Sequence, residues 1–312
     1  MKEYDVIIMV TPEKIPLLEA SYLYLEQNLG AKNIFLIANK MLEKRITNIW
    51  NGKMKYIDEE SIMPGLSLSA IKDILIKKCG DSHRAGWFYQ QFLKMAYSQV
   101  CQNDYYLLWD ADTVPLHKIN YFENGETPYF ITKKEYYSGY FETIDRLFNG
   151  RVGRVNLQVS YIAENMMIHK EYMKEIIEEI LANKSLNGDT FYEKILDAIP
   201  PRIISCTGFS EFETYGNYMD TIHPGVYKQK KLRTQRLGSF LLGTSPSREQ
   251  LEWVAQDYDI ISFEEHGKQW LKKLTQKRWI QKCFHAQNLF KLFIGISNFN
   301  DRICGRPFAK ID

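Results

Sequence analysis

The chain has 312 residues, of which 45% are hydrophobic and 25% are charged, and this composition excludes a mainly disordered protein. Its 40 Lys and Arg residues nearly balance 38 Asp and Glu residues, which leaves a formal charge of +2. That balance is untypical of a general nucleic-acid binder, so we expect no nucleic-acid partner.

The first predicted elements form a β-α-β unit. Residues 4–10 and 32–39 are short apolar runs typical of buried strands, and residues 15–25 between them show helical periodicity. The crossover in such a unit implies parallel pairing of its two strands. We therefore predict the α/β class, with a mixed, mostly parallel sheet flanked by helices.

Later segments continue the alternation of helices and strands. Helical periodicity covers residues 66–79, 86–101, 171–181, 190–199 and 210–219, and strand-like runs cover residues 104–109, 159–168 and 258–263. No linker rich in Pro, Gly or Ser interrupts this pattern. We predict one domain over residues 1–265, with halves of about 1–115 and 116–265, and a C-terminal helical appendage over residues 266–312.

Two carboxylates follow the predicted strand 104–109 directly. Asp110 and Asp112 stand where the strand ends, and ligands of open parallel sheets bind beyond the carboxyl ends of strands. Two carboxylates at this spacing can approach a hard divalent cation and leave positions open for phosphate oxygens. The second such pair, Asp257 and Asp259, precedes its strand and indicates a turn instead.

The predicted helix 86–101 carries a polar stripe. Gln90 and Lys94 share one face at i and i+4, Trp87 and Gln91 lie beside them, and Arg84 precedes the helix. These side chains can hydrogen-bond a sugar or ribose and place positive charge near a phosphate. The alternative is that the aromatic residues are core and the polar residues face solvent.

Three further acidic side chains are candidates for the site. Glu164 and Asn165 lie in an otherwise apolar run, where unpaired polar groups are costly. They therefore either bind sugar hydroxyls or form a satisfied buried pair or a strand bulge. Glu213 stands at the capping-box position of a helix that begins after Ser210, whereas Glu211 has no such structural explanation. We predict Glu211 as a general base, with Glu213 as the second candidate.

Taken together, these motifs resemble a family. The ordered combination R-x-G-W-x-x-Q-Q-x-L-K, D-A-D-T, A-E-N-M-M and F-S-E-F-E-T-Y-G-N-Y, over about residues 4–225, is similar to bacterial GT-A-fold glycosyltransferases of capsule and lipopolysaccharide biosynthesis. The resemblance implies sugar transfer from a nucleotide-diphosphate donor to a surface-polysaccharide or lipooligosaccharide acceptor. It favours a UDP-hexose as the donor, because this is the commonest donor in such families. It implies Mn²⁺ or Mg²⁺ as cofactor.

The resemblance also assigns roles to individual residues. It places a metal ion on Asp110, Asp112 and His223, the last as the third ligand that such enzymes supply late in the chain. It implies that the donor is contacted by the following residues: Thr11, Pro12, Arg84, Gly86, Trp87, Gln90, Gln91, Lys94, Asp110, Ala111, Asp112, Glu164, Asn165 and Lys231. If the reaction retains the anomeric configuration, Glu211 orients the acceptor instead of acting as a base.

The C-terminal segment and the location of the protein complete the expectations. Residues 268–296 are basic, lack Asp and Glu, and place aromatic residues at helical spacing. This amphipathic pattern predicts either peripheral contact with an anionic membrane or docking onto the catalytic domain. The longest apolar runs span only five residues, and the first residues do not look like a leader peptide, so we expect a cytoplasmic protein, with that contact at the inner face of the cytoplasmic membrane.

Two rival functions remain open. A nucleotidyl- or phosphotransferase uses the same pairing of carboxylates with a metal ion, although the chain has no G-x-x-x-x-G-K-[ST] loop. A non-catalytic carbohydrate-binding protein would also account for the many aromatic residues. Metal-dependent binding of a nucleotide would separate a transferase from the binding protein.

Overall fold

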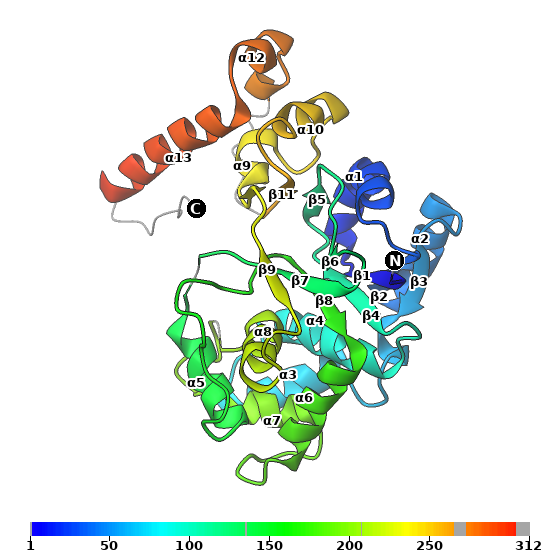
Figure 1. Ribbon diagram of the computed structural model, residues 1–312, viewed down its shortest axis with the longest axis vertical. Coiled ribbons are helices and arrows are strands. Elements are labelled where there is room, and N and C mark those ends of the chain that lie inside the picture. Colours follow the sequence, from blue (N-terminus) through cyan, green and yellow to red (C-terminus); the bar gives the residue numbers. More distant parts are fainter. Residues whose placement is uncertain (1, 135, 207, 265–272, 304–312) are drawn as a thin grey trace. The chain divides into compact units, whose positions relative to one another are not determined.

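Figure 1 shows the computed structural model, which describes residues 2–134, 136–206, 208–264 and 273–303, with side chains up to residue 295. The chain forms two units. The first contains residues 1–11, 31–110 and 121–231, and the second contains residues 12–30, 111–120 and 232–312. The predicted boundary between residues 265 and 266 falls in the stretch 265–272, outside the described residues, and stays a prediction.

A five-stranded sheet organises the first unit, in the order β3-β2-β1-β4-β8. Neighbouring strands pair in parallel except β8, which is antiparallel to β4. The predicted mixed, mostly parallel sheet of an α/β protein is therefore confirmed. All six residues of β1 are buried, as expected for a strand covered on both faces. The bounds are β1 Tyr4–Met9, β2 Asn33–Ala38, β3 Lys55–Asp58, β4 Tyr105–Trp109 and β8 Asn165–His169.

The strand order reverses beside β1. The chain builds β1, β2 and β3 outward in one direction and then places β4 on the other side of β1. Such a reversal leaves a crevice at the carboxyl ends of the two strands it separates, which is where open α/β sheets bind ligands. Thr11 follows the end of β1 and Asp110 follows the end of β4, so the fold directs both residues to this edge.

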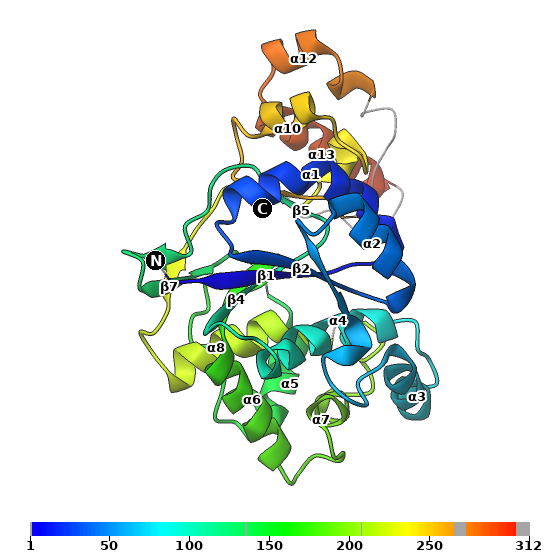
Figure 2. The same cartoon turned by 90° about the vertical axis from the view of Figure 1, so that its right-hand side faces the viewer.

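One helix of the first unit, α2 Glu43–Trp50, lies on one side of this sheet, and the other helices of the unit gather on the opposite side (Figure 2). Aromatic side chains join these other helices in one core, where Phe92 packs edge-on against Phe191 with ring centroids 6.0 Å apart. The helices are α2 Glu43–Trp50, α3 Leu68–Cys79, α4 Ala85–Ala96, α5 Ser138–Leu147, α6 Lys170–Ala182, α7 Phe191–Ala198 and α8 Glu211–Ile222. A small sheet adds β6 Phe122–Glu123, β7 Thr127–Ile131 and β9 Lys228–Lys230.

Gly216 lets α8 pack closely in this unit. A Cβ atom at this position would lie 2.2 Å from the ring of Tyr161, a distance that no side chain tolerates. The glycine of the F-S-E-F-E-T-Y-G motif therefore allows α8 to approach the segment that leads into β8. This contact helps to set where the first residue of α8, Glu211, is held.

The second unit has its own core, which Leu17, Val114, Trp253, Ile261 and Phe290 share. Its strands are β5 Thr113–Pro115, β10 Thr234–Gln235 and β11 Ile260–Ser262, and β11 pairs with both of the others. Its helices are α1 Ile15–Asn28, α9 Gly238–Leu242, α10 Arg248–Val254, α12 Arg278–Cys283 and α13 Ala286–Ile303. Among the described helices of both units, none has the length and apolar character needed to span a membrane.

Most predicted elements are confirmed within a few residues, but the strand over residues 159–168 is not. β8 begins only at Asn165, because Glu164 has a φ of +56° and so leaves the extended conformation. The polar Glu164 was expected inside a strand, whereas the structure places it at a bend just before one. This bend turns out to belong to the candidate site.

Candidate functional site

Lys94 joins two carboxylates at the carboxyl edge of the sheet. It lies on α4, is 7% exposed, and places its Nζ 2.7 Å from Asp110 Oδ1 and 2.8 Å from Glu211 Oε1. Asp110 follows β4 and Glu211 begins α8, so three separate segments converge on one ammonium group. The structure thus brings together three residues that the sequence singled out in three different motifs.

The charge on Lys94 is held in place by its neighbours. Burial disfavours the ammonium form, but the two adjacent carboxylates outweigh burial and raise the pKa of Lys94 above its usual value. The ammonium also lies 4.5 Å from the centroid of the Phe212 ring, which adds a cation–π contact. Lys94 is therefore a fixed positive charge between Asp110 and Glu211 at any physiological pH.

Glu211 is oriented at both its backbone and its side chain. Its backbone N–H, one of the unpaired donors of the first turn of α8, donates to Gln91 Oε1 at 3.1 Å. Its Oε1 accepts from Lys94, while no hydrogen bond to its Oε2 is found within the described residues. The side chain is only 4% exposed. Glu211 is thus a rigidly held carboxylate with one oxygen left for a substrate.

A second lysine pairs with Glu164 nearby. Lys133 Nζ lies 2.5 Å from Glu164 Oε2, and both side chains are buried. The backbone N–H of Asp110 donates to the carbonyl oxygen of Glu164 at 2.9 Å, which ties the bend before β8 to the end of β4. A left-handed non-glycine residue costs about 1 kcal/mol or more, and such strain collects at functional sites.

We call Lys94, Asp110, Lys133, Glu164 and Glu211 the β4 cluster. Two ammonium groups and three carboxylates give these five side chains one net negative charge when all are ionised. A diphosphate entering here would meet net repulsion. An additional cation would convert that repulsion into attraction, so the charge of the β4 cluster favours a bound metal ion.

Glu213 points to other partners than Glu211. The Ser160 hydroxyl donates to its Oε1, and Asn217 Nδ2 donates to its Oε2 at 2.9 Å. Ser210 caps α8 by accepting from the Glu213 N–H, but the reciprocal bond of a capping box is not among the contacts of the Glu213 carboxylate. The capping-box explanation for Glu213 is therefore only half met, because its side chain instead fastens α8 to the segment before β8.

Burial raises the pKa of the Glu213 carboxyl above its ordinary 4.5, although hydrogen bonds from Ser160 and Asn217 work in the opposite direction. A raised pKa in the folded state means that this group contributes stability below the unfolded value and loses it as the pH rises through the folded value. We expect Glu213 to make the free energy of unfolding fall with rising pH in this window, and the fall to be smaller in Glu213→Gln. Urea unfolding of both proteins between pH 4 and 7, compared point by point, measures it; identical pH profiles would contradict the expectation.

The other predicted residues of α4 divide into two kinds. Arg84 stacks its guanidinium over Trp87, 4.2 Å from the ring centroid, and Gly86 is exposed with no described atom within 4 Å of a Cβ built there. With the half-buried Gln90, these residues remain accessible to a ligand. Gln91 instead uses both ends of its amide inside the protein, on the Glu211 N–H and the Trp87 carbonyl.

Asn165 is likewise occupied inside the protein. Its Oδ1 accepts from the Tyr121 hydroxyl at 2.9 Å and its Nδ2 donates to the Ala163 carbonyl at 2.7 Å. The residue is fully buried. The alternative of a satisfied buried amide therefore describes Asn165, and its role is to hold the bend at Glu164 in place.

Asp112 belongs to the second unit and has its own lysine. Lys14, in the short helix η1 (Pro12–Lys14), places its Nζ 3.1 Å from Asp112 Oδ2. The backbone carbonyl of Asp112 accepts from the Phe263 N–H at 2.7 Å, which anchors the start of β5 to the end of β11. Both side chains of the pair are about a quarter exposed, and Pro12 is exposed while Ala111 is buried.

His223 does not join the acidic residues. It caps the C-terminal end of α8, 12 residues after Glu211, which corresponds to about 18 Å along a helix. There its Nε2 lies 2.8 Å from Glu175 Oε2 and its ring packs on Tyr172. The expectation that His223 is a third metal ligand beside Asp110 is corrected by this placement. Lys231 is exposed after the end of β9.

The carboxylates of the candidate site do not by themselves form a complete metal site. Within the described residues no group of three His, Cys, Asp or Glu side chains is placed to hold one. Carboxylate oxygens are nevertheless what Mg²⁺ and Mn²⁺ prefer, and Mg²⁺ is commonly held by one or two carboxylates together with substrate phosphates. The carboxylate of Asp110 and that of Asp112, each taken by itself, are therefore of the chemistry that such an ion prefers, and the net negative charge of the β4 cluster favours a cation beside Asp110.

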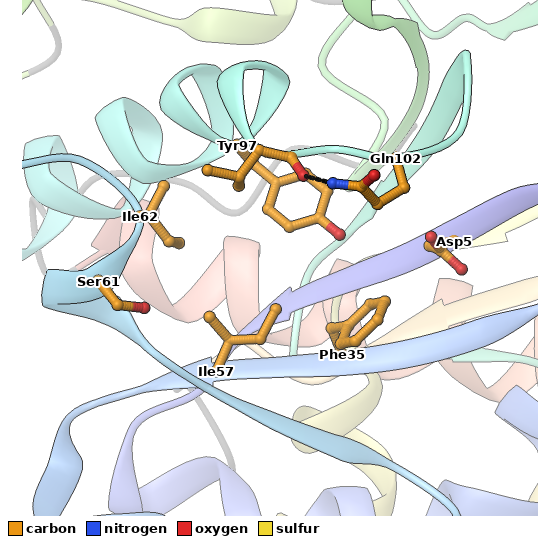
Figure 3. Close-up of a pocket in the computed structure, with 8 residues that line it drawn as sticks. Asp5, Phe35, Ile57, Ser61, Ile62, Tyr97 and Gln102 are labelled. Atoms are coloured by element: carbon orange, nitrogen blue, oxygen red, sulfur yellow. Dashed lines mark hydrogen bonds between the residues drawn. The ribbon is translucent and has the colours of Figure 1, made fainter.

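A cavity of about 280 Å³ in the first unit lies apart from these residues (Figure 3). Phe35, Ser61, Tyr97 and Gln102 help to line it, together with Asp5, whose carboxylate accepts from Asn33 and Asn103. None of its lining residues belongs to the β4 cluster. The buried Asp5 is satisfied by these two amides, so we assign it a structural role.

Sequence reasoning missed two residues that shape the site. Lys133 neutralises Glu164, and Ser160 holds Glu213. The backbones of Lys133 and Ser160 form a two-way bridge, with N–H···O distances of 3.0 and 2.8 Å. No spacing in the sequence links these residues to their carboxylates, since Lys133 is 31 positions from Glu164 and Ser160 is 53 positions from Glu213.

A protein-family model matches residues 35–281 and describes a family of unknown function, DUF6492. The chain belongs to this family. A comparison with curated proteins finds no match to this DUF6492 chain. The family assignment therefore adds no activity to what the geometry supports.

Among solved structures, the DUF6492 chain is similar to three glycosyltransferases. Mouse xyloside xylosyltransferase 1 shows 10% identity and a TM-score of 0.42, over 84% of this chain and 98% of that one. WbbM, a bifunctional glycosyltransferase, shows 10% identity and a TM-score of 0.46, over 86% of this chain and 47% of that one. GlyE of Streptococcus pneumoniae shows 12% identity and a TM-score of 0.38, over 95% of this chain and 64% of that one. These TM-scores are low, so the proposal below rests on the chain's own residues.

Proposed function

We propose that this protein is a glycosyltransferase that moves a sugar, most simply a UDP-linked hexose, to a hydroxyl of a surface-polysaccharide or lipooligosaccharide acceptor. The observation that carries the proposal is the β4 cluster, in which Lys94 links Asp110 and Glu211 at the carboxyl edge where the strand order reverses. Open α/β sheets bind nucleotides at this edge. The motif resemblance supplies the sugar and its acceptor.

The donor side is proposed around the ends of β1 and β4. Thr11 follows β1 and is the candidate contact for the nucleotide, with Pro12 next in the chain. The exposed Gly86 and the Arg84 guanidinium at the start of α4 suit a diphosphate, and Lys231 is a further candidate cation. Gln90, one turn before Lys94 on the same helix, is proposed to bind a hydroxyl of the sugar or ribose.

A divalent cation would be held by Asp110, with Asp112 two residues further along the chain. When bound, it would neutralise charge that develops on the diphosphate as the glycosidic bond breaks. The chain's own contribution is to orient Asp110 through Lys94 and through the backbone bond to Glu164. The metal part of the proposal rests on chain spacing and on the charge of the β4 cluster.

The acceptor hydroxyl must lose a proton as it attacks the anomeric carbon. We propose that Glu211 takes this proton at Oε2, because Oε1 is engaged by Lys94 and α8 is anchored through Gln91. Lys94 and Gln91 hold the carboxylate of Glu211 in one orientation. Glu213 remains the second candidate, although its two oxygens already accept from Ser160 and Asn217.

The decisive experiment is a thermal-shift panel of UDP, GDP, CMP and dTDP, each with Mn²⁺ or with EDTA. A ligand at about 100 times its Kd should raise Tm by roughly 5 °C, since it binds only the folded state. We expect a shift with one nucleotide that requires Mn²⁺ and is lost in Asp110→Asn/Asp112→Asn. The matched control is Asp257→Asn/Asp259→Asn, which alters the other acidic pair and should keep the shift.

The outcomes separate the rival functions. No shift with any nucleotide, from protein that unfolds cooperatively, would favour a carbohydrate-binding protein. A nucleotide shift without transfer of sugar to any glycan, together with release of pyrophosphate or phosphate, would favour a nucleotidyl- or phosphotransferase. A shift of equal size in EDTA would overturn the metal part of the proposal and leave the donor part standing.

A further inference from the structure

The segment 273–295, which contains α12 and the first part of α13, carries exposed positive charge without an ion pair among the described residues. Residues 273–295 contain five lysines and arginines and no Asp or Glu. All five side chains are exposed, and within the described residues none of them forms an ion pair. They are Lys273, Lys277, Arg278, Lys282 and Lys291. The predicted basic character of the segment is therefore real surface charge; Lys268 and Lys272 lie outside the described residues.

The same helices pack one apolar face into the core of the second unit, to which they belong. Ile280, Leu289, Phe290 and Ile294 are buried in its core, and Trp253 Nε1 donates to the Phe284 carbonyl at 2.8 Å. Docking, one of the two alternatives for this segment, is thus confirmed for this face. The amphipathic pattern does not by itself require a membrane.

Docking leaves several large apolar side chains in solvent. Trp279 is 56% exposed, Phe284 45% and Leu292 54%. Two of them stand among the unpaired cations, and we call Lys277, Arg278, Trp279, Lys282 and Phe284 the basic-aromatic surface. A tryptophan that is exposed beside cations without ion pairs does not contribute to a hydrophobic core. Interfacial helices present this combination of aromatic and basic side chains to lipid headgroups.

We propose that the basic-aromatic surface binds the headgroup region of an anionic lipid bilayer. The ammonium and guanidinium groups would reach phosphate and glycerol oxygens, while Trp279 and Phe284 enter the boundary with the acyl chains. A nucleic acid is a poorer fit, because its phosphates would satisfy the cations while the exposed aliphatic side chain of Leu292 stayed in water. The proposal is independent of sugar transfer, although an enzyme with a lipid-linked acceptor would gain from it.

The test is flotation of the full-length protein with vesicles of phosphatidylcholine alone, or of phosphatidylcholine mixed with the anionic lipid phosphatidylglycerol. We expect binding only to the anionic vesicles, and weaker binding at high salt because screening shortens the reach of the charges. Each cation near such a surface contributes about fivefold, so Lys277→Gln/Arg278→Gln/Lys282→Gln should bind about 100-fold more weakly. Trp279→Ser should bind about tenfold more weakly.

Matched controls remove the same chemistry elsewhere. Lys44→Gln/Arg45→Gln/Lys72→Gln deletes three exposed cations of α2 and α3 that have no ion pair among the described residues. Met41→Ser deletes an apolar side chain that is 90% exposed. Both variants should float as the unmodified protein does.

Three results would overturn the proposal. They are absence of binding to anionic vesicles, equal loss of binding in the α2 and α3 control, and equal or tighter binding of a single-stranded oligonucleotide through the same residues. Circular dichroism spectra that match the unmodified protein show that the variants are folded. Flotation needs neither donor nor turnover, so absence of vesicle binding would leave the glycosyltransferase proposal untouched. Absence of sugar transfer would likewise leave the membrane proposal untouched.

Discussion

Replacing Lys94 with methionine is expected to lower the free energy of unfolding by about 3 kcal/mol. The substitution keeps the apolar stem of the side chain and removes the ammonium that Asp110 and Glu211 share. Glu211 is 4% exposed and would be left as a buried, uncompensated charge, whereas Asp110 is about one-third exposed and contributes less. Urea denaturation at neutral pH, with Tm as a second readout, measures the loss.

Lys14→Met is the matched control, because it also removes an ammonium from one carboxylate of the acidic pair. The Lys14–Asp112 bridge is partly exposed on both sides, so its loss should cost less than about 1 kcal/mol. The double variant Lys94→Met/Glu211→Gln should recover part of the loss, since no buried charge then lacks a partner. Equal destabilisation by the two single substitutions would show that the Lys94 pairing is no stronger than a surface salt bridge.

The pH dependence of the Lys94 effect has a definite sign. Because the carboxylates raise the pKa of Lys94 above its ordinary 10.5, the pairing contributes its full stability below that value and loses it only at higher pH. The stability deficit of Lys94→Met relative to the unmodified protein should therefore stay constant across neutral pH and shrink only as the pH rises toward the folded-state pKa of Lys94. A deficit that already shrinks between neutral pH and the ordinary lysine pKa would show that the two carboxylates do not hold the ammonium in its charged form.

Replacing Glu211 with glutamine is expected to abolish sugar transfer, with a fall in kcat of about 10²–10⁴ and unchanged donor binding. Glutamine keeps the shape of the side chain and an oxygen for Lys94, but it cannot take a proton. The measurement is turnover of the donor that the thermal-shift panel identifies, together with its Kd for each variant. A Tm close to that of the unmodified protein shows that α8 is still in place.

Glu213→Gln controls this experiment on the same helix. It removes a carboxylate whose oxygens face Ser160 and Asn217, so we expect a change in stability and a much smaller change in kcat. Unmodified turnover in Glu211→Gln would refute its role as the base. If only Glu213→Gln lost turnover, the assignment would pass to Glu213.

Local patterns in the sequence were sufficient to predict most helices and strands and the class of the fold. The apolar runs that became β1, β2 and β4, and the periodicity that became α4 and α8, each depend on side chains a few positions apart. The position of Asp110 beyond a buried strand followed from the same reasoning. The order β3-β2-β1-β4-β8 then placed it beside a reversal that no single segment encodes.

The partners of the charged residues were decided only by the tertiary structure. Lys94 meets Glu211 across 117 positions, Lys133 meets Glu164 across 31, and His223 is carried to the far end of α8 from Glu211. Periodicity determines which face of a helix is buried, but the partner of a buried charge depends on how helices pack. The amino-acid sequence alone therefore determined the α/β fold class and most candidate residues, whereas packing decided which of them share a charge.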